Sequence, residues 1–408
     1  MEKISRYILV LVAILTFSIF LPDFYWKLFE KPNRSPFVLY SCIDKDFIIQ
    51  QGRNRYDNKG NKLTRKEWEE KLPLLNMRQL MIYGLFPDSI NGCIMDPHEI
   101  GLNKSFFRFK PKDMNTPQAH LFPLFESESG RVKIEMPQDF FRITKRMEFV
   151  DAKTNSVIKN KSRMFTAVLQ KRGFAFPAKL IAGIPTTRKS CDEGYIVTDS
   201  KDQLFHIKMV KGHPYIQKVK VPKGLKFKYI ACVDFRDKKY YCYLFSQKNE
   251  IYILTQDEYD LIKFPIKDFQ PKKEELRIFG DLFNYNVIRL GENYTQVVAL
   301  DKEYKKVAEY NKTWLSRAER KEGKVFSYIF PAQISMFNKY SDYINFYYAK
   351  TKGFNWIILN LLLVFGHFLI LKRRKVIFKN HLIDFSIILI TGIYGFLAVN
   401  LFQNKFFK

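Results

Sequence analysis

The stretch LILKRRKVIFKNHLID, residues 369–384, places four consecutive cations between two long apolar runs. The run before them, residues 353–371, and the run after them, residues 385–404, contain no Lys, Arg, Asp or Glu. Each run has roughly the 20 residues that a helix needs to cross the hydrocarbon core of a bilayer. The sequence therefore predicts a transmembrane helical hairpin over residues 351–404.

A third apolar run lies near the amino terminus, at residues 7–22. Phe24, Tyr25 and Trp26 extend it, and aromatic side chains of this kind gather at membrane interfaces. A cleaved signal peptide is the alternative, but the bulky stretch FLPDFYWK offers no small-residue cleavage site. We therefore expect residues 1–26 to form an uncleaved transmembrane anchor.

Cations set the expected orientation of these three helices. Short loops rich in Lys and Arg stay in the cytoplasm, so the loop of the predicted hairpin is expected there. Its four cations are Lys372, Arg373, Arg374 and Lys375. Lys3 and Arg6, before the first run, agree with this orientation, whereas Lys405 and Lys408 at the tail would lie outside, against the rule. Residues 27–350 then form the extracytoplasmic (periplasmic) domain of a multi-pass protein of the inner membrane.

The chain is strongly basic, with a formal net charge of +27 over 408 residues. Such a charge on a cytoplasmic protein would favour nucleic acid as a partner, and the expected location excludes that class. A lysine-rich soluble surface explains the charge, and so does attraction to anionic lipid head groups or envelope polymers. The expected partners are therefore the lipid bilayer and a membrane protein complex, and no nucleic acid.

Short β-prone runs separated by polar turns dominate the chain from about residue 100 onward. Four of them recur at separations of 47, 47 and 46 residues, near Val157, Leu204, Ile251 and Val297. A period in this range fits the four strands of a propeller blade, and another all-β architecture is the alternative. The predicted fold is a mainly β, propeller-like extracytoplasmic domain plus three transmembrane helices.

One segment of the outer domain, about residues 64–84, is predicted to be helical. Thr64 and Glu67 have the spacing of a capping box, in which each side chain binds the other residue's backbone N–H. Pro73 is expected to begin a second helix. The apolar face of the segment consists of Trp68, Leu72, Leu75 and Leu80.

All five cysteines fall in the predicted outer domain, where disulfides persist. Cys232 and Cys242 flank the turn FRDKKY and are expected to lie opposite each other across a hairpin. A disulfide between them and simple packing of two small apolar side chains are both compatible with this placement. The sequence has no CxxC motif, so neither a thioredoxin-type site nor a zinc ribbon is predicted.

The sequence lacks the motifs of common catalytic and cofactor sites, among them GxSxG, HExxH, Walker A and a GxGxxG after a strand. We therefore predict no catalytic residue, no cofactor and no metal site. His206 and His213 flank Met209 in one predicted hairpin, but two ligands at this spacing are too few to predict a metal site.

Ionisable residues inside membrane segments are functional candidates by default. His367 and Asp384 are equidistant from the centre of the predicted cytoplasmic loop, so two antiparallel helices would place them at similar depth. We hypothesise that they pair with each other and fix the helix hairpin. Asn360, deeper in the same hairpin, is expected to form a hydrogen bond across helices.

Four stretches of the chain carry a resemblance to a known family. They are VLYSCIDKDFII at 38–49, DNKGNKLTRKEWEEKLPLLNMRQL at 57–80, PDSINGC at 87–93 and SGRVKIEMPQDFFRI at 129–143. Together they resemble an uncharacterised bacterial family that is defined as a domain of unknown function. The resemblance implies a membrane-anchored extracytoplasmic protein and an association with genes for ABC-type transport components. It implies no catalytic residues.

These observations favour a protein that is not an enzyme. The leading hypothesis is a membrane-anchored extracytoplasmic binding or assembly protein that is accessory to an ABC-type transport complex. An envelope hydrolase with paired carboxylates on scattered loops of the β domain is the second hypothesis. A ligand sensor is the third, and it would have to act through a membrane partner because the expected cytoplasmic parts are very short.

Overall fold

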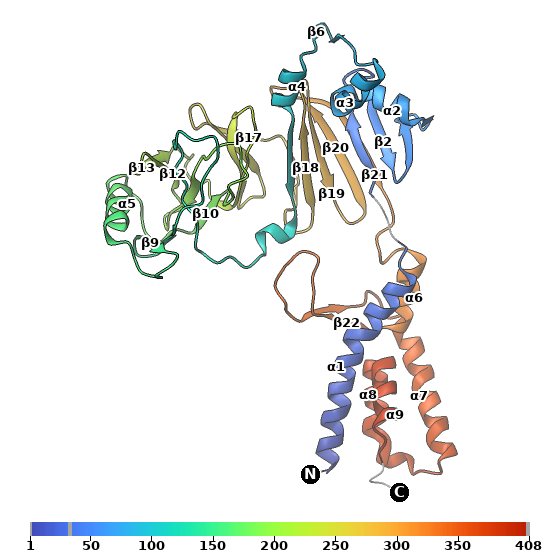
Figure 1. The fold of residues 1–408 in the computed structure, drawn as a ribbon. Helices are drawn as coiled ribbons and strands as arrows, with labels where there is room; N and C mark the ends of the chain where they lie inside the picture. The colour runs from blue at the N-terminus through green and yellow to red at the C-terminus, as the bar shows by residue number, and fades with distance from the viewer. Residues whose placement is uncertain (1, 32–34, 405–408) are drawn as a thin grey trace. The chain divides into compact units, whose positions relative to one another are not determined.

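The computed structural model describes residues 2–31 and 35–404, with side chains from Ile4 onward (Figure 1). The chain divides into two compact units. Unit 1 comprises Met1–Arg34, Glu292–Tyr294 and Lys312–Lys408. Unit 2 comprises Ser35–Gly291 and Thr295–Asn311. The predicted outer domain, residues 27–350, thus includes all of unit 2 and part of unit 1.

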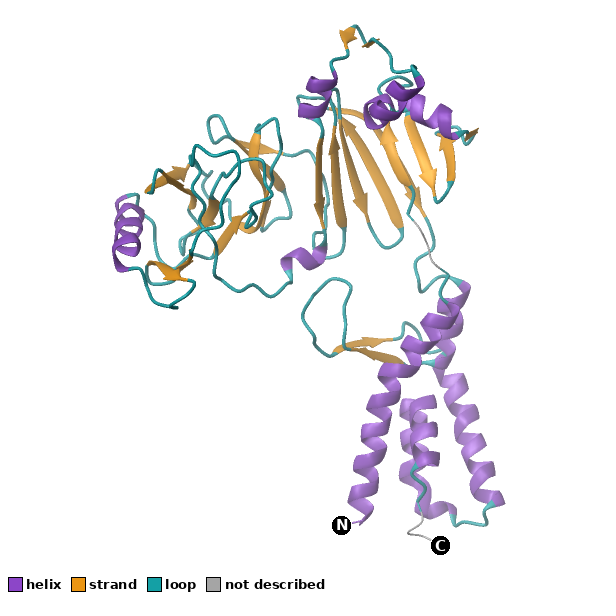
Figure 2. Cartoon of the chain, in the orientation of Figure 1, coloured by secondary structure: helices purple, strands orange, loops and turns teal. Residues whose placement is uncertain are grey.

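Helices make up most of unit 1 (Figure 2). Its elements ahead of the carboxyl-terminal segment are α1 (Glu2–Phe29), α6 (Lys321–Ile329), β22 (Ala332–Ser335), β23 (Tyr347–Lys350) and α7 (Trp356–Arg373). Within the described residues, two stretches, Ile4–Phe29 and Trp356–Arg373, are long and apolar enough to cross a membrane. Most of the side chains in both stretches are not covered by the rest of the unit. The predicted aromatic group near the end of α1 is partly buried, because Trp26 stacks on Phe326 of α6.

The third predicted span is corrected by the structure, which shows two short helices in place of one. The 3₁₀ helix η2 (Phe378–His381) leads into α8 (Leu382–Thr391), and α9 (Ile393–Leu401) follows. The break falls at Gly392, whose φ of 62° and ψ of −130° suit glycine alone. A helix of this length covers about 15 Å, roughly half of a bilayer core.

The two short helices α8 and α9 run in opposite directions. Arg6 donates to the carboxylate of Asp384, at the start of α8, and to the carbonyl of Phe402, just after the end of α9, at 2.9 and 2.8 Å. Asn404 also donates to the carbonyl of Asn380, ahead of α8. The segment therefore returns to the end of the bundle at which it began.

Two antiparallel sheets pack together in unit 2, with strand orders β1-β2-β3-β4 and β21-β20-β19-β18-β7. Their strands are β1 (Phe37–Tyr40), β2 (Phe47–Gln51), β3 (Asn54–Asp57), β4 (Lys62–Leu63), β7 (Ser105–Phe109), β18 (Glu275–Gly280), β19 (Tyr285–Leu290), β20 (Tyr294–Leu300) and β21 (Lys306–Thr313). Val38 and Ile48 of the first sheet share a buried core with Ile288 of the second. The backbone N–H of Tyr40 also donates to the Asn286 side chain at 2.7 Å.

Three short helices lie near one end of these sheets (Figure 1). They are α2 (Arg65–Lys71), α3 (Pro73–Tyr83) and α4 (Pro97–Asn103). The predicted capping box is confirmed, since Thr64 Oγ1 accepts from the Glu67 N–H and the Glu67 carboxylate accepts from the Thr64 N–H. Pro73 begins α3 as predicted, and Gly84 ends it with a φ of 65°.

The rest of unit 2 is built from further antiparallel sheets. One sheet consists of β10 (Leu180–Gly183), β11 (Tyr195–Thr198), β12 (Leu204–Val210) and β13 (His213–Val219). Another consists of β14 (Phe227–Cys232), β15 (Tyr240–Ser246), β16 (Ile251–Thr255) and β17 (Leu261–Lys263). The remaining elements are β5 (Ser89–Ile90), β6 (Cys93–Ile94), η1 (Pro111–Met114), β8 (Asp139–Ile143), β9 (Met147–Asp151) and α5 (Lys159–Lys171). Phe107 of β7 stacks on Tyr243 of β15 and joins the two sheets that contain them in one core.

The predicted repeat corresponds to successive four-stranded units, but these units do not close into a propeller among the described residues. Leu204, Ile251 and Val297 each lie on the third strand of such a unit. Val157 lies outside the named strands, in an isolated bridge to Val150. The period reflects the length of one unit and carries no information on how the units are arranged in space. In this fold, β7 pairs with the edge strand β18 of one unit. The fold is therefore mainly β, with several small antiparallel sheets.

Candidate functional site

An apolar cavity of about 250 Å³ lies in unit 2, between the α2–α3 corner and strands β1, β7 and β18. Pro73 begins α3 directly after α2, and this abrupt corner directs three leucines toward the sheet. Leu72 and Leu74 are buried in the wall, while Leu75 is at the exposed rim. The other lining residues are Leu39, Tyr40, Cys42, Lys104, Ser105, Phe106, Phe279, Gly280, Asp281 and Asn286. Apolar pockets with a few polar groups are typical of small-molecule sites.

One acidic and one basic side chain line the cavity, Asp281 and Lys104. The carboxylate of Asp281 accepts the backbone N–H groups of Phe283 and Asn284 at 2.9 and 2.8 Å, and burial raises its pKa. Lys104 has one long contact, 3.4 Å to a backbone carbonyl. Burial and the positive charge of Arg78 lower the pKa of Lys104. Since Asp281 already has backbone partners, Lys104 is the charged group available to a ligand.

A second, more open hollow of about 740 Å³ adjoins the cavity and shares Leu75, Lys104 and Phe106 with it. Arg78 of α3 and Arg236 of the turn between β14 and β15 also line this hollow. Both arginines are exposed, and neither has a side-chain partner in the part of the chain that the structure describes. The two hollows together thus combine an apolar wall with three cationic side chains.

A buried polar cluster joins the helices of unit 1. Arg6 of α1 donates to both carboxylate oxygens of Asp384 at 2.9 and 3.1 Å, and the two side chains are 6% and 1% exposed. Nδ1 of His381 lies 3.0 Å from the same carboxylate. Two parallel bonds between a guanidinium and a carboxylate fix orientation as well as charge. The cluster therefore ties the amino-terminal part of α1 to the α8–α9 hairpin.

His367, the predicted partner of Asp384, is buried beside this cluster without binding it. Neither of its ring nitrogens has a hydrogen bond to the described residues. Asp384 binds Arg6 in its place, because a guanidinium offers two parallel donors and a full positive charge. Asn360 forms the predicted bond across helices, since its Nδ2 donates to the Leu389 carbonyl at 2.8 Å.

The same cluster contains a set of potential metal ligands. Ligand atoms of His367, His381 and Asp384 lie within 4.8 Å of one another, and two imidazoles with a carboxylate suit zinc. However, the Arg6 guanidinium already neutralises the carboxylate and opposes a second positive charge beside it. We therefore assign no metal to this cluster.

The four cations predicted to set the topology lie together at the end of α7 and directly after it. Lys372, Arg373, Arg374 and Lys375 are all exposed. They follow His367 on α7 and precede Asp384 on α8, and so they lie at the end of unit 1 that contains the Arg6 cluster. The tail residues Lys405 and Lys408 lie outside the described residues.

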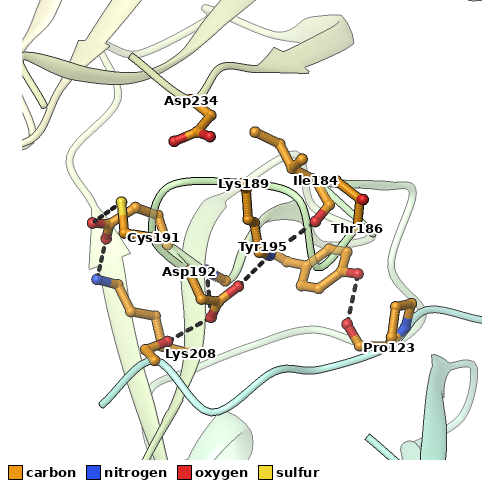
Figure 3. A network of polar contacts seen from close by, with 12 residues as sticks. Pro123, Ile184, Thr186, Lys189, Cys191, Asp192, Tyr195, Lys208 and Asp234 are labelled. Carbon is orange, nitrogen blue, oxygen red and sulfur yellow. Dashed lines mark hydrogen bonds and ion pairs between the residues drawn. The ribbon is translucent and has the colours of Figure 1, made fainter. Parts of the chain in front are cut away.

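A second buried ion pair, in unit 2, is structural. Nζ of Lys189 donates to Asp192 and to the Ile184 carbonyl (Figure 3). It also lies 4.0 Å from the centre of the Phe125 ring. Asp192 also accepts from the Ser127 hydroxyl at 2.6 Å. Both charged groups are thus satisfied inside the protein, and the pair holds the loop between β10 and β11 in place.

The predicted cysteine pair lies directly opposite in register, Cys232 on β14 and Cys242 on β15. Both are free thiols in the structure, so the disulfide stays a prediction. Burial raises the pKa of Cys242 well above its usual value. Cys191 is partly buried, and burial raises its pKa as well. A raised pKa disfavours the reactive thiolate.

The histidine pair of the β12–β13 hairpin does not assemble a site. His206 is buried, with Nδ1 2.8 Å from the Tyr259 hydroxyl and Nε2 2.6 Å from the Glu193 carbonyl. Burial lowers the pKa of His206 to about 3. Since both of its ring nitrogens have partners and His213 is exposed, these two residues hold no metal together.

Sequence reasoning used Arg6 only as a topology signal and did not single out Arg78 or Arg236. A signal for Arg6 was present, because Asp384 is an acidic residue in an apolar region and a buried charge requires a counter-charge. For Arg78 and Arg236 the sequence offered no signal, since they are 158 residues apart among many other cations.

The fold and its sites define a mainly β protein with two long apolar helices and no recognised catalytic group among the described residues. Residues 37–300 match a family model described as "Domain of unknown function (DUF4857)". The match covers more than half of the chain, and the chain belongs to this family. Among curated proteins, no sequence matches it.

Proposed function

We propose that this chain is a membrane-anchored extracytoplasmic binding and assembly protein, and that it is an accessory subunit of an ABC-type membrane transport complex. The observation that carries the proposal is the uncovered apolar surface of unit 1. Leu11 of α1 is 57% exposed and Leu362 of α7 is 61% exposed, and both belong to long runs of such side chains. A surface of this kind requires lipid or a membrane partner to cover it.

In this proposal α1 and α7 cross the membrane, and the α8–α9 hairpin enters and leaves on the cytoplasmic side. The exposed cations of the α7–α8 loop support that side for the loop. The bonds from Arg6 to both ends of the hairpin support the same side for the amino-terminal end of α1. Unit 2 is then extracytoplasmic, in the periplasm.

The accessory role follows from what unit 1 offers inside a membrane. Two spans and a short hairpin with one satisfied ion pair do not provide the polar lining of a transport route. They do provide a rigid anchor, because the ion pair fixes helices that are distant in sequence. The resemblance of the chain to proteins associated with ABC-type transport genes supports a permease and its ATPase as the partners.

Affinity purification tests the proposal. The full chain with a carboxyl-terminal tag is extracted in a mild detergent after brief chemical cross-linking, and co-purifying proteins are identified by mass spectrometry. We expect a membrane permease and an ATP-binding subunit, both missing from a parallel purification of an unrelated tagged membrane protein. Recovery of the chain without any membrane protein partner would contradict the accessory role.

A further inference from the structure

The cavity of unit 2 and the hollow beside it form one continuous surface of mixed character. Leu75, Lys104 and Phe106 belong to both. On the cavity side the wall is mostly apolar, with the buried carboxylate of Asp281 held by backbone N–H groups, and on the hollow side it contains Arg78 and Arg236. A ligand that occupies both must therefore have an apolar part and an anionic part.

The size of the cavity limits the apolar part. A volume of about 250 Å³ corresponds to roughly eight groups of about 30 Å³ each, the share of one water molecule in the liquid. One hydrocarbon chain of medium length fits such a space, and a pair of chains does not. Buried Leu72 and Leu74, with Phe279 opposite, offer this chain no hydrogen-bonding group.

The charges of the hollow define the other end of the ligand. Three cations line the hollow, Arg78, Lys104 and Arg236, and Asp234 is the acidic residue in the same lining. The Asp234 carboxylate accepts from the backbone N–H and the hydroxyl of Ser190 at 2.7 and 2.5 Å, so it is not a partner of the three cations. The guanidinium groups of Arg78 and Arg236, which have no side-chain partner within residues 2–31 and 35–404, are suited to bidentate binding of a carboxylate or a phosphate.

We propose that unit 2 binds a single-chain anionic amphiphile, with its hydrocarbon tail in the cavity and its head group against Arg78, Lys104 and Arg236. This inference states which class of ligand the binding role would involve, and in that respect it rests on the proposed function. The head-group chemistry is shared by a free fatty acid and by a lysophospholipid with a terminal phosphate. The surrounding membrane is a source of both.

Photolabelling of the full chain tests this site. The chain is reconstituted in nanodiscs of zwitterionic lipid and irradiated with decanoate that carries a diazirine near its methyl end. In parallel arms the probe is the matching decanamide or a decanoyl lysophosphatidic acid with the same diazirine. Labelled peptides are then mapped by mass spectrometry. We expect saturable labelling of peptides from α3 and β7 by the anionic probes, and about tenfold weaker labelling by the amide. The stronger of the two anionic probes identifies the source.

Chain length supplies an internal check on the cavity. Each methylene that leaves water contributes about fourfold in affinity, so competition by unlabelled fatty acids should strengthen about fourfold per added carbon. The gain should stop once the chain exceeds roughly eight to ten carbons. A gain that continues to sixteen carbons would indicate partition into the bilayer and would overturn the site.

Matched variants keep the test independent of folding. Arg78→Gln with Arg236→Gln should lower the affinity for both anionic probes at least tenfold, and these exposed side chains have no partners to lose among the described residues. Leu75→Trp should block the cavity from its rim. Arg53→Gln, at an exposed cation that lines neither hollow, should change nothing. Equal labelling of all variants, or adducts confined to unit 1, would overturn the inference.

The same preparations separate this inference from the proposed function. If a permease and its ATPase co-purify but the cavity is not labelled, the ligand assignment is wrong and the accessory role stands. If the cavity is labelled but no partner co-purifies, the accessory role is wrong and the ligand site stands.

Discussion

Removal of one partner of the Arg6–Asp384 ion pair should destabilise unit 1 strongly. Both side chains are almost fully buried and joined by two charge-assisted bonds. Loss of one partner leaves the other charge buried without compensation, which costs about 3–5 kcal/mol. Arg6→Met and Asp384→Leu should therefore each lower the Tm of unit 1 by about 10 °C, since 1 kcal/mol moves the Tm of a domain by roughly 2–4 °C or more.

The double variant Arg6→Met with Asp384→Leu decides whether the cost comes from the ion pair itself. Replacement of a buried pair by apolar residues is often neutral or stabilising. The double variant should therefore lie close to the wild type in stability and leave a coupling free energy of several kcal/mol. Thermal unfolding in a mild detergent, followed by tryptophan fluorescence, measures this. The fluorescence reports mainly on unit 1, because three of the four tryptophans belong to it, Trp26, Trp314 and Trp356.

Lys27→Met provides the matched control, because Lys27 is an exposed cation in the same helix. Its substitution should change the Tm of unit 1 by no more than a degree or two. The reasoning is refuted if Arg6→Met costs no more than Lys27→Met. It is also refuted if the double variant loses the sum of the two single effects.

Two further predictions concern single residues. The pKa of His206 is about 3 in the folded state and about 6.5 in the unfolded state. As pH falls, the unfolded state therefore binds a proton first, and the folded state loses stability from pH 6.5 downward. His206→Gln should remove about 1.4 kcal/mol per pH unit of this dependence below pH 6.5, measured by urea unfolding, and an unchanged slope would exclude the buried neutral imidazole. Gly392→Ala should destabilise the α8–α9 hairpin, because the new Cβ would lie 2.2 Å from Asn360 Oδ1. Gly366→Ala is the control: its Cβ meets nothing within 4 Å, so this variant should be neutral or stabilising. Equal Tm values for the two variants would contradict this packing.

Local sequence patterns predicted the local structure well. The apolar runs that became α1 and α7 are continuous, so length and composition suffice to identify them. The capping box at Thr64 depends on two residues three positions apart. The period of about 47 residues reflects the length of a four-stranded unit, because each unit is formed by strands that are adjacent in sequence.

Features that depend on distant residues were not predictable in the same way. The ion-pair partner of Asp384 is Arg6, which is 378 residues away in the sequence. Equal depth in the predicted helical hairpin had instead indicated His367 as the partner. Gly392 lies within an uninterrupted apolar run, so hydropathy gives no sign that the chain reverses there. The proposed amphiphile site draws its residues from α3, from Lys104 and the adjoining β7, and from the β14–β15 turn, which only the folded sheets bring together.

The most direct test of the account concerns the location of unit 2. Cys93 is an exposed cysteine of unit 2, and Ile377 is exposed in the loop between α7 and α8. A membrane-impermeant maleimide is added to spheroplasts that contain the wild type, Cys93→Ser, or Cys93→Ser with Ile377→Cys. The account predicts that the wild type is labelled in intact spheroplasts and that Cys93→Ser loses this label. The cysteine introduced at position 377 should react only after lysis. Labelling of Cys93 only after lysis would place unit 2 in the cytoplasm and contradict the account.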